Sequence, residues 1–154
     1  MSSSTLIPID NCIDAIKVIN IRNECNEYMT NNKSKINIFQ QLLWYFFIYL
    51  KENKKKNMYC YLLRNKNILG FGFIRKYSNK FWLTGGLYKK DRNKGYGKLL
   101  FEQLVNIIHL NEIWLEVLKT NIIAANLYKK LGFKKIKSKK INGQMIYIMK
   151  LLKK

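Results

Sequence analysis

The sequence predicts a mixed α/β fold within one domain that covers residues 1–154. Some segments repeat apolar residues at helical spacing, and others are short runs rich in aromatic and β-branched residues, which is typical of strands. Pro8 is the one proline, and the chain shows neither an internal repeat nor a Gly-rich or Pro-rich linker. The segments follow the order two helices, three strands, helix, strand, helix and two strands, so we expect an α/β architecture without a domain boundary.

Two helices are expected in the first third of the chain. Residues 10–29 have apolar residues at helical intervals behind Asp10 or Asn11 as the N-cap, with a break near Ile21. Residues 36–51 form the second expected helix. Its apolar run from Leu42 to Leu50 is far shorter than the ~20 residues of a membrane span, so we expect a buried helix.

Three strands are expected over residues 58–64, 68–76 and 81–88. Their short polar connections predict an antiparallel meander. The chain then continues with a helix over 95–110, a buried strand over 113–118 and a helix over 121–131 that Gly132 closes. Residues 133–137 and 145–151 predict a terminal hairpin.

A glycine-rich turn between the third strand and the next helix has the character of an anion-binding site. Its residues are Arg92, Asn93, Lys94, Gly95, Tyr96, Gly97 and Lys98. The two glycines allow a tight backbone with several N–H groups converging, and the helix adds its positive dipole end. A pyrophosphate suits such a turn, although a plain helix start uses similar residues.

A second segment follows the turn and carries Asn121, Ala124, Leu127 and Tyr128, ending at Gly132 and Phe133. Together the two segments resemble the GNAT acetyltransferase superfamily, with its Arg/Gln-x-x-Gly-x-Gly/Ala and Asn-x-x-Ala-x-x-Leu-Tyr-x-x-x-Gly-Phe signatures. The resemblance implies the GNAT fold, a mixed sheet of about six to seven strands flanked by four helices, with residues 6–9 as the first strand. It also implies acetyl-CoA as cosubstrate, an amine acceptor and no metal.

The resemblance assigns roles to individual residues. The pyrophosphate ligands would be Arg92, Asn93, Lys94, Gly95, Tyr96, Gly97 and Lys98, and the pantetheine and oxyanion positions Gly85, Gly86 and Leu87. Asn121 would contact pantetheine or simply cap its helix, and the glycine pair could equally mark a strand bulge. Tyr128 would bind acetyl-CoA and protonate the thiolate, the alternative being a tyrosine that packs its helix on the sheet.

Glu116 lies inside an apolar strand, where an unpaired charge is costly. It could act as the general base, directly or through a water, or it could face solvent or pair with a lysine. The run Trp114-Leu115-Glu116-Val117, followed by Tyr128, resembles the branch that acetylates protein N-termini, including ribosomal-protein alanine acetyltransferases. Leu118 stands where relatives have arginine, and Lys89 where they have proline. We expect a peptide or protein amine as acceptor, the alternative being a small amine, polyamine or amino sugar.

The formal net charge of +20 leaves nucleic acid or the ribosome open as partners, and a non-catalytic basic binding module as an alternative function. Biased base composition is the simpler explanation of the charge, because lysines far outnumber arginines. The three cysteines and His109 show no metal-ligand spacing. The first eight residues lack the features of a secretory signal, so we expect a cytoplasmic location and no membrane partner. We also expect a monomer or a homodimer.

Overall fold

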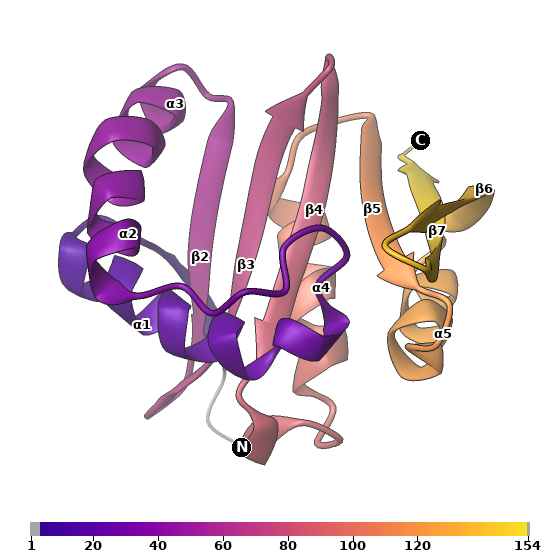
Figure 1. Ribbon diagram of the computed structural model, residues 1–154, viewed down its shortest axis with the longest axis horizontal. Helices are drawn as coiled ribbons and strands as arrows, with labels where there is room; N and C mark the ends of the chain where they lie inside the picture. Colours follow the sequence, from indigo (N-terminus) through magenta and orange to yellow (C-terminus); the bar gives the residue numbers. More distant parts are fainter. Residues whose placement is uncertain (1–3, 154) are drawn as a thin grey trace.

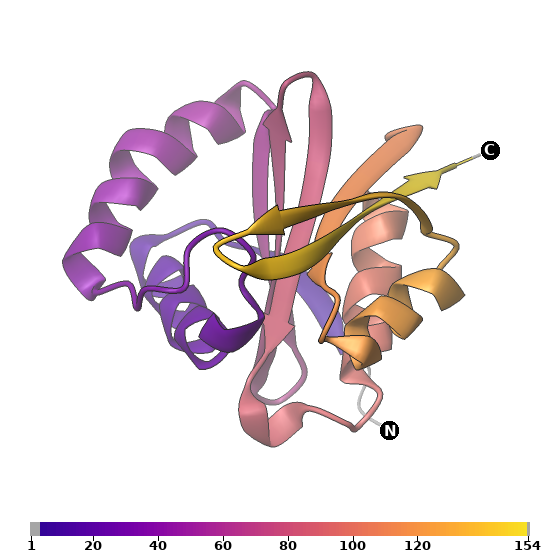
Figure 2. The same ribbon diagram turned by 45° about the vertical axis from the view of Figure 1, so that its right-hand side comes forward.

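A seven-stranded sheet, in the order β1-β2-β3-β4-β5-β7-β6, has helices on both faces (Figure 1 and Figure 2). The structure, a computed structural model, describes residues 4–153, so residues 1–3 of the N-terminal segment discussed above lie outside it. The strands are β1 (Thr5–Pro8), β2 (Met58–Arg64), β3 (Ile68–Tyr77), β4 (Lys80–Leu87), β5 (Glu112–Leu118), β6 (Lys134–Ile141) and β7 (Gln144–Leu152). The helices are α1 (Cys12–Glu24), η1 (Asn26–Tyr28), α2 (Ile38–Leu43), η2 (Trp44–Tyr49), α3 (Leu50–Lys54), η3 (Lys89–Asp91), α4 (Tyr96–Ile107) and α5 (Ile122–Lys130).

Strands β1 to β4 form the predicted antiparallel meander, and β5, β7 and β6 continue the sheet. Strands β4 and β5 run parallel, and the pair of Trp82 with Trp114 joins them near their first residues. Beyond this pair the two strands separate towards their carboxyl ends, as Figure 1 shows. The ends of β4 and β5 therefore have main-chain groups on their facing edges that the sheet does not use.

Apolar side chains pack on both faces of the sheet. On one face, Leu100 and Leu104 of α4 and Tyr128 of α5 form a buried cluster with residues of the sheet. On the other face, Ile21 of α1 and Tyr45 of η2 belong to a second buried cluster. Burying apolar area on two faces is the principal stabilising contribution in such a fold. The central strands are thereby fixed between two helical layers.

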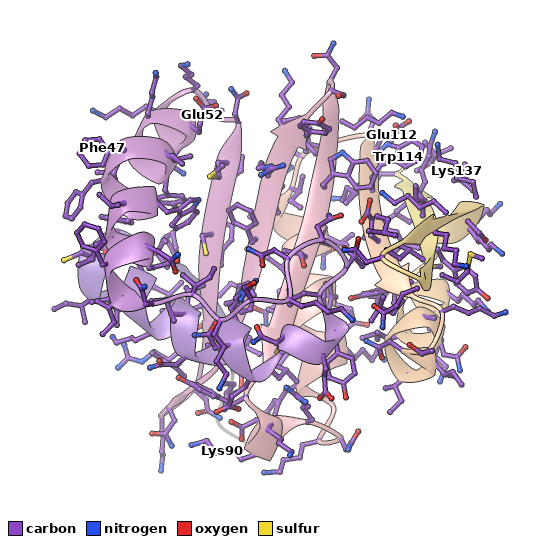
Figure 3. The ribbon with its side chains drawn as sticks, in the orientation of Figure 1. Phe47, Glu52, Lys90, Glu112, Trp114 and Lys137 are labelled. Atoms are coloured by element: carbon purple, nitrogen blue, oxygen red, sulfur yellow. The ribbon has the colours of Figure 1, made fainter. Side chains whose placement is uncertain are left out.

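The predicted helix over residues 36–51 exists but is not a buried helix. Tyr45 and Tyr49 are buried, whereas Phe46, Phe47 and Ile48 point to solvent, with Phe47 72% exposed (Figure 3). The four-residue spacing of Tyr45 and Tyr49 puts both tyrosines on one side of the helix, which passes here through a π-helical stretch, η2. The three apolar residues between them lie on the opposite side. A run without polar residues, Leu42 to Leu50, does not indicate in the sequence which side is exposed.

Asparagine caps determine where the first two helices begin. The Asn11 side chain accepts a hydrogen bond from the Asp14 N–H at 2.9 Å, and Asn37 forms a capping box that delays the second helix beyond the expected start. Helix α1 does not break near Ile21. It continues because the Cys25 N–H still donates to the Ile21 carbonyl at 3.2 Å.

The backbone properties of Pro8 and Gly132 suit their positions at the ends of a strand and of a helix. Pro8 ends β1, an edge strand, where its missing N–H removes no hydrogen bond from the interior of the sheet. Gly132 has a φ of +92° directly after α5, in agreement with the predicted helix end. Across residues 4–153, no helix combines the length and apolar character that crossing a bilayer requires.

Candidate active site

The glycine-rich turn folds as a cradle of backbone N–H groups at the start of α4. Asn93 and Gly95 have positive φ values of 60° and 83°, which turn the chain sharply into the helix. Leu99 donates the first helical hydrogen bond, to the Gly95 carbonyl at 3.3 Å. The N–H groups of Tyr96, Gly97 and Lys98 precede it, and α4 has no side-chain cap. These groups and the helix dipole favour a bound anion.

Lysines surround this cradle. Lys94 lies 3.8 Å from an Asp91 carboxylate oxygen, and Lys98 lies 3.6 Å from a Glu102 oxygen. Both ammonium groups are largely exposed, so they remain free to exchange these partners for a phosphate. Lys90 lies at the same end of the molecule (Figure 3) and lines an open cavity of about 790 Å³ with Glu24, Tyr88 and Lys89. The region offers positive charge and room for a phosphorylated ligand.

The Arg92 side chain has partners within the protein. Its Nη2 donates to the Glu24 carbonyl at 2.8 Å and its Nε to the Leu87 carbonyl at 3.4 Å. The guanidinium also lies over the Tyr28 ring, 5.2 Å from its centroid, and 3.6 Å from a Glu27 oxygen. Arg92 therefore holds the turn against the end of α1. The sequence suggested only a ligand contact for this side chain.

Gly85, Gly86 and Leu87 end β4, where the strand separates from β5. The pairing of β3 with β4 runs without a register shift through Gly85 and Gly86, so the bulge considered from the sequence is absent here. Close packing explains the glycines. A Cβ on Gly86 would lie 2.6 Å from the Cys25 sulfur, and one on Gly85 would lie 2.8 Å from the Phe71 carbonyl oxygen. The glycines let α1 and β3 approach the strand.

Tyr128 projects from α5 into the core beside the β4 end. Its ring makes edge-to-face contacts with Phe101 and Phe133, at centroid distances of 4.9 and 6.0 Å. Burial raises the pKa of Tyr128, and the Cys25 thiol adds to the shift, so the phenol keeps its proton at neutral pH. The Asn121 side chain caps α5 by accepting from the Ala124 N–H at 3.2 Å. The capping role is thus present in the structure, and the packing role of Tyr128 is as well.

Glu116 is enclosed and fully engaged. Its side chain is 13% exposed, and Lys139 Nζ lies 2.5 Å from its Oε1. Thr30 donates its hydroxyl to Oε2 at 2.9 Å, and Asn31 donates to the same oxygen at 3.4 Å. The alternative that Glu116 pairs with a lysine is therefore correct. The ion pair does not test its role as a base.

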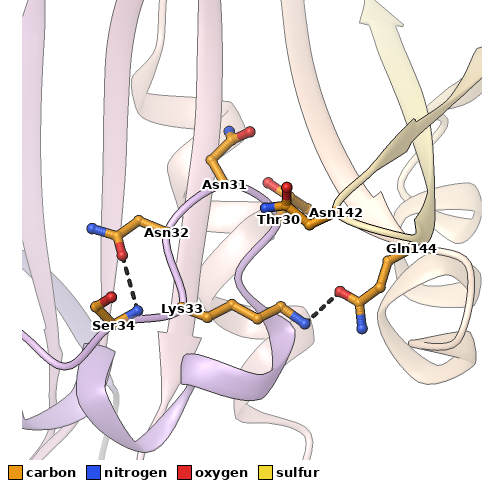
Figure 4. Close-up of a pocket in the computed structure, with 7 residues that line it drawn as sticks. All are labelled: Thr30, Asn31, Asn32, Lys33, Ser34, Asn142 and Gln144. Atoms are coloured by element: carbon orange, nitrogen blue, oxygen red, sulfur yellow. Dashed lines mark hydrogen bonds between the residues drawn. The ribbon is translucent and has the colours of Figure 1, made fainter.

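Thr30 and Asn31, which bind Glu116, also line a polar cavity of about 590 Å³ (Figure 4). Its lining comes from the loop after η1 and from the β6–β7 turn: Thr30, Asn31, Asn32, Lys33, Ser34, Asn142 and Gln144. Lys33 donates to the Gln144 side chain and so joins the two segments. Sequence reasoning missed the loop, because a polar stretch without periodicity gives no sign of what it covers.

The three cysteines are free thiols, two of them buried, and no pair forms a disulfide. Within residues 4–153, no three His, Cys, Asp or Glu side chains gather closely enough to hold a metal ion.

Comparison with known proteins identifies the family. The acetyltransferase (GNAT) family model matches residues 17–133, well over half of the chain. The matched segment contains both the glycine-rich turn and Tyr128. No curated protein matches the chain.

Solved structures share the fold at low sequence identity. Spermidine N-acetyltransferase from Vibrio cholerae, in complex with CoA and spermine, has 18% identity and a TM-score of 0.80, over 97% of this chain and 95% of that one. An N-acetyltransferase from Staphylococcus aureus Mu50 has 12% identity and a TM-score of 0.79, covering 98% and 99%. The yncA protein of Salmonella typhimurium, solved with acetyl-CoA, has 15% identity and a TM-score of 0.79, covering 98% and 94%.

These likenesses confirm the predicted fold, and the family match confirms the acyltransferase class and acetyl-CoA as the cosubstrate. They do not extend to the N-terminal acetylation branch. The sequence signatures, the sheet and the family model agree: the chain belongs to the acetyltransferase (GNAT) family.

Proposed function

We propose that this acetyltransferase transfers acetyl to the α-amine of a peptide or protein by direct attack in a ternary complex. The main support is the meeting of three features at one place. The N–H cradle of α4 lies at the carboxyl end of β4, β4 and β5 separate there, and Tyr128 lies beside them. An elongated thioester between the strands, with its phosphates on the cradle, would use all three.

The residues of this region fit acetyl-CoA, which supplies the acetyl group as a thioester. The N–H groups of Tyr96, Gly97 and Lys98 would hold the pyrophosphate, and Asn93, Lys94 and Gly95 would shape the turn. A Cβ at Gly97 would contact Leu127 at 3.7 Å and Leu87 at 3.9 Å, so this part of the turn lies close to α5 and to the end of β4. The main chain of Gly85, Gly86 and Leu87 would align the pantetheine and offer a donor to the developing oxyanion. Asn121 would add an amide contact, and Arg92 would keep the turn in place.

Proton transfer is assigned to two side chains. Glu116 would take a proton from the ammonium group of the acceptor, directly or through a water, and leave the neutral amine that attacks the thioester carbonyl. The Glu116 side chain projects from β5 and accepts hydrogen bonds from Thr30 and Asn31, which line the polar cavity. Tyr128 would give its proton to the departing thiolate. Its raised pKa keeps the phenol protonated until that moment, and a CoA thiol needs only a weak acid.

The peptide acceptor follows from the run Trp114-Leu115-Glu116-Val117 with Tyr128, which resembles the N-terminal acetylation branch. A small amine, polyamine or amino sugar is the second candidate, because the spermidine enzyme of Vibrio cholerae shares this fold. A non-catalytic basic module is the third, on the strength of the net charge of +20. A cytoplasmic location and a monomeric or homodimeric state stay predictions.

The deciding experiment measures acetyl-CoA-dependent thiol release with peptide N-termini, lysine peptides, polyamines and amino sugars, followed by mass spectrometry of the products. We expect an acetylated peptide α-amine. An acetylated polyamine or amino sugar instead would transfer the proposal to the second candidate. CoA binding without release for any amine, together with salt-sensitive binding of RNA, would favour the basic module.

A further inference from the structure

The face of the sheet that carries Glu116 also carries unpaired positive charge. In the sheet register, Glu116 is opposite Ile148 of β7, and Ile148 is opposite Lys137 of β6. Residues directly opposite in antiparallel strands point to the same face, so Lys137 shares the face of Glu116. Lys139, two residues further on, reaches Glu116 itself. Figure 3 shows Lys137 at the same side of the molecule as β6 and β7.

The polar cavity adds a third lysine and no carboxylate. Lys33 lines the cavity and binds the Gln144 amide, which carries no charge. The other lining residues are neutral. Among the ion pairs formed by residues 4–153, none includes Lys33 or Lys137. We call Lys33, Lys137 and Lys139 the lysine rim.

This charge distribution selects among amine acceptors. The Glu116 carboxylate binds Thr30 and Asn31 of the cavity lining, and these two residues and Lys139 already occupy its oxygens. A polyamine carries several ammonium groups and would meet further positive charge at the rim. An amine with a carboxylate or phosphate close by would instead give Lys33 and Lys137 an anionic partner.

We propose that the acceptor is an anionic amine, with a carboxylate or phosphate near the reacting nitrogen that binds the lysine rim. The inference rests on the proposed function, because it places the acceptor in the cavity next to Glu116. An acidic peptide N-terminus is the form that agrees with the proposed peptide acceptor. A free amino acid with a side-chain carboxylate, or a phosphorylated amino sugar, carries the same chemistry.

The test compares peptides of one length that begin with serine and continue with three glutamates, three glutamines or three lysines. Glutamate, glucosamine 6-phosphate and spermidine serve as small-molecule arms that separate the sources of negative charge. We expect kcat/KM to fall from the acidic to the neutral to the basic peptide, by roughly fivefold for each paired charge. The difference should shrink in 0.5 M salt.

Two variants separate the rim from the general charge of the chain. The double variant Lys33→Gln, Lys137→Gln changes two exposed side chains outside the proposed acid and base, and it should reduce the preference for the acidic over the neutral peptide by about tenfold or more. Lys66→Gln removes an exposed charge in the β2–β3 turn and should leave the preference unchanged. Equal thermal unfolding of the three proteins shows that the fold is intact.

Each outcome supports or overturns either the anionic acceptor or the proposed function. A preference for spermidine or for the lysine peptide, or an acidic preference that the double variant retains, overturns the anionic acceptor while acetylation itself still supports the proposed function. Loss of preference in Lys66→Gln as well would assign it to the net charge and overturn the rim. Absence of acetylation with every amine, despite CoA binding, refutes the proposed function and the inference with it.

Discussion

The two glycines of the α4 cradle should respond in opposite ways to the same substitution. Gly95 has a φ of +83°, and no neighbour lies within 4 Å of the position that an added methyl group would take, so alanine would be strained by its backbone and not by space. Gly97 lies in the first turn of α4, where a Cβ would contact Leu127 at 3.7 Å and Leu87 at 3.9 Å, both ordinary packing distances. Alanine there adds a good helix former without a clash.

The expected changes in the free energy of unfolding follow from these geometries. Gly95→Ala should lose about 1 kcal/mol or more, because an L-residue is disfavoured in the left-handed region. Gly97→Ala should gain up to about 1 kcal/mol, which corresponds to roughly 2–4 °C in Tm for a chain of this size. Gly97→Glu should also fold stably, because a carboxylate in the first turn interacts favourably with the helix dipole.

The variants should rank differently by CoA affinity than by free energy of unfolding. The carboxylate of Gly97→Glu would occupy the N–H cradle and repel the pyrophosphate. The loss of two charge-assisted hydrogen bonds, about 3 kcal/mol together, predicts a Kd at least about a hundredfold higher. Urea unfolding and calorimetric titration with CoA measure the two quantities on the same proteins. A Gly97→Glu protein that binds CoA within a few fold of wild type would refute the cradle as the pyrophosphate site.

Three further predictions concern single side chains. Tyr128→Phe keeps the ring packing and should lower kcat by about a hundredfold or more, with CoA affinity nearly unchanged; wild-type turnover in a thiol-release assay would rule out the acid role. Burial raises the pKa of Cys60 to about 12, so the native state keeps a proton that the unfolded chain loses above pH 9. Stability should therefore be unaffected below pH 9 and fall between pH 9 and 12, and Cys60→Ala should make this fall shallower by up to about 1.4 kcal/mol per pH unit in urea unfolding. Tyr49→Ala, at a site 3% exposed, should cost about 3 kcal/mol or more in urea unfolding, whereas Phe47→Ala, at a site 72% exposed, should change stability by less than about 0.5 kcal/mol; equal effects would contradict the orientation of η2.

Much of the fold can be predicted from the sequence because its signals are local. Strand β2 has the predicted bounds, and Ser78 and Asn79 adopt the positive φ values expected of a tight turn between β3 and β4. The end of α5 at Lys130, two residues before Gly132, is equally local. The π-helical stretch is different, since no residue pattern distinguishes it from an α-helix.

The site also has features that are local in the sequence and features that depend on distant segments. The cradle of α4 depends on a few consecutive residues, so the glycine spacing indicates it. The partners of Arg92 come from the end of α1, and those of Glu116 come from a loop before α2 and from β6. These contacts join segments far apart in the chain. A single sequence contains no signal for them, because a polar loop has no apolar periodicity that would place it. The ion pair at Glu116 could be named only as one of two possibilities.

Glu116, the proposed base, is bound by Lys139, Thr30 and Asn31, and must be released from the lysine before it can take a proton. The Lys139 ammonium, 2.5 Å from Oε1, occupies one of the two oxygens with which Glu116 could take a proton. An acceptor carboxylate or phosphate at the lysine rim would compete with Glu116 for Lys139, while the Thr30 hydroxyl continues to orient the Glu116 side chain. A neutral or cationic amine offers no such competitor and leaves the ion pair intact. Charge recognition and release of the base would then depend on the same lysine, which makes the anionic acceptor consistent with a general base that is paired before the acceptor binds.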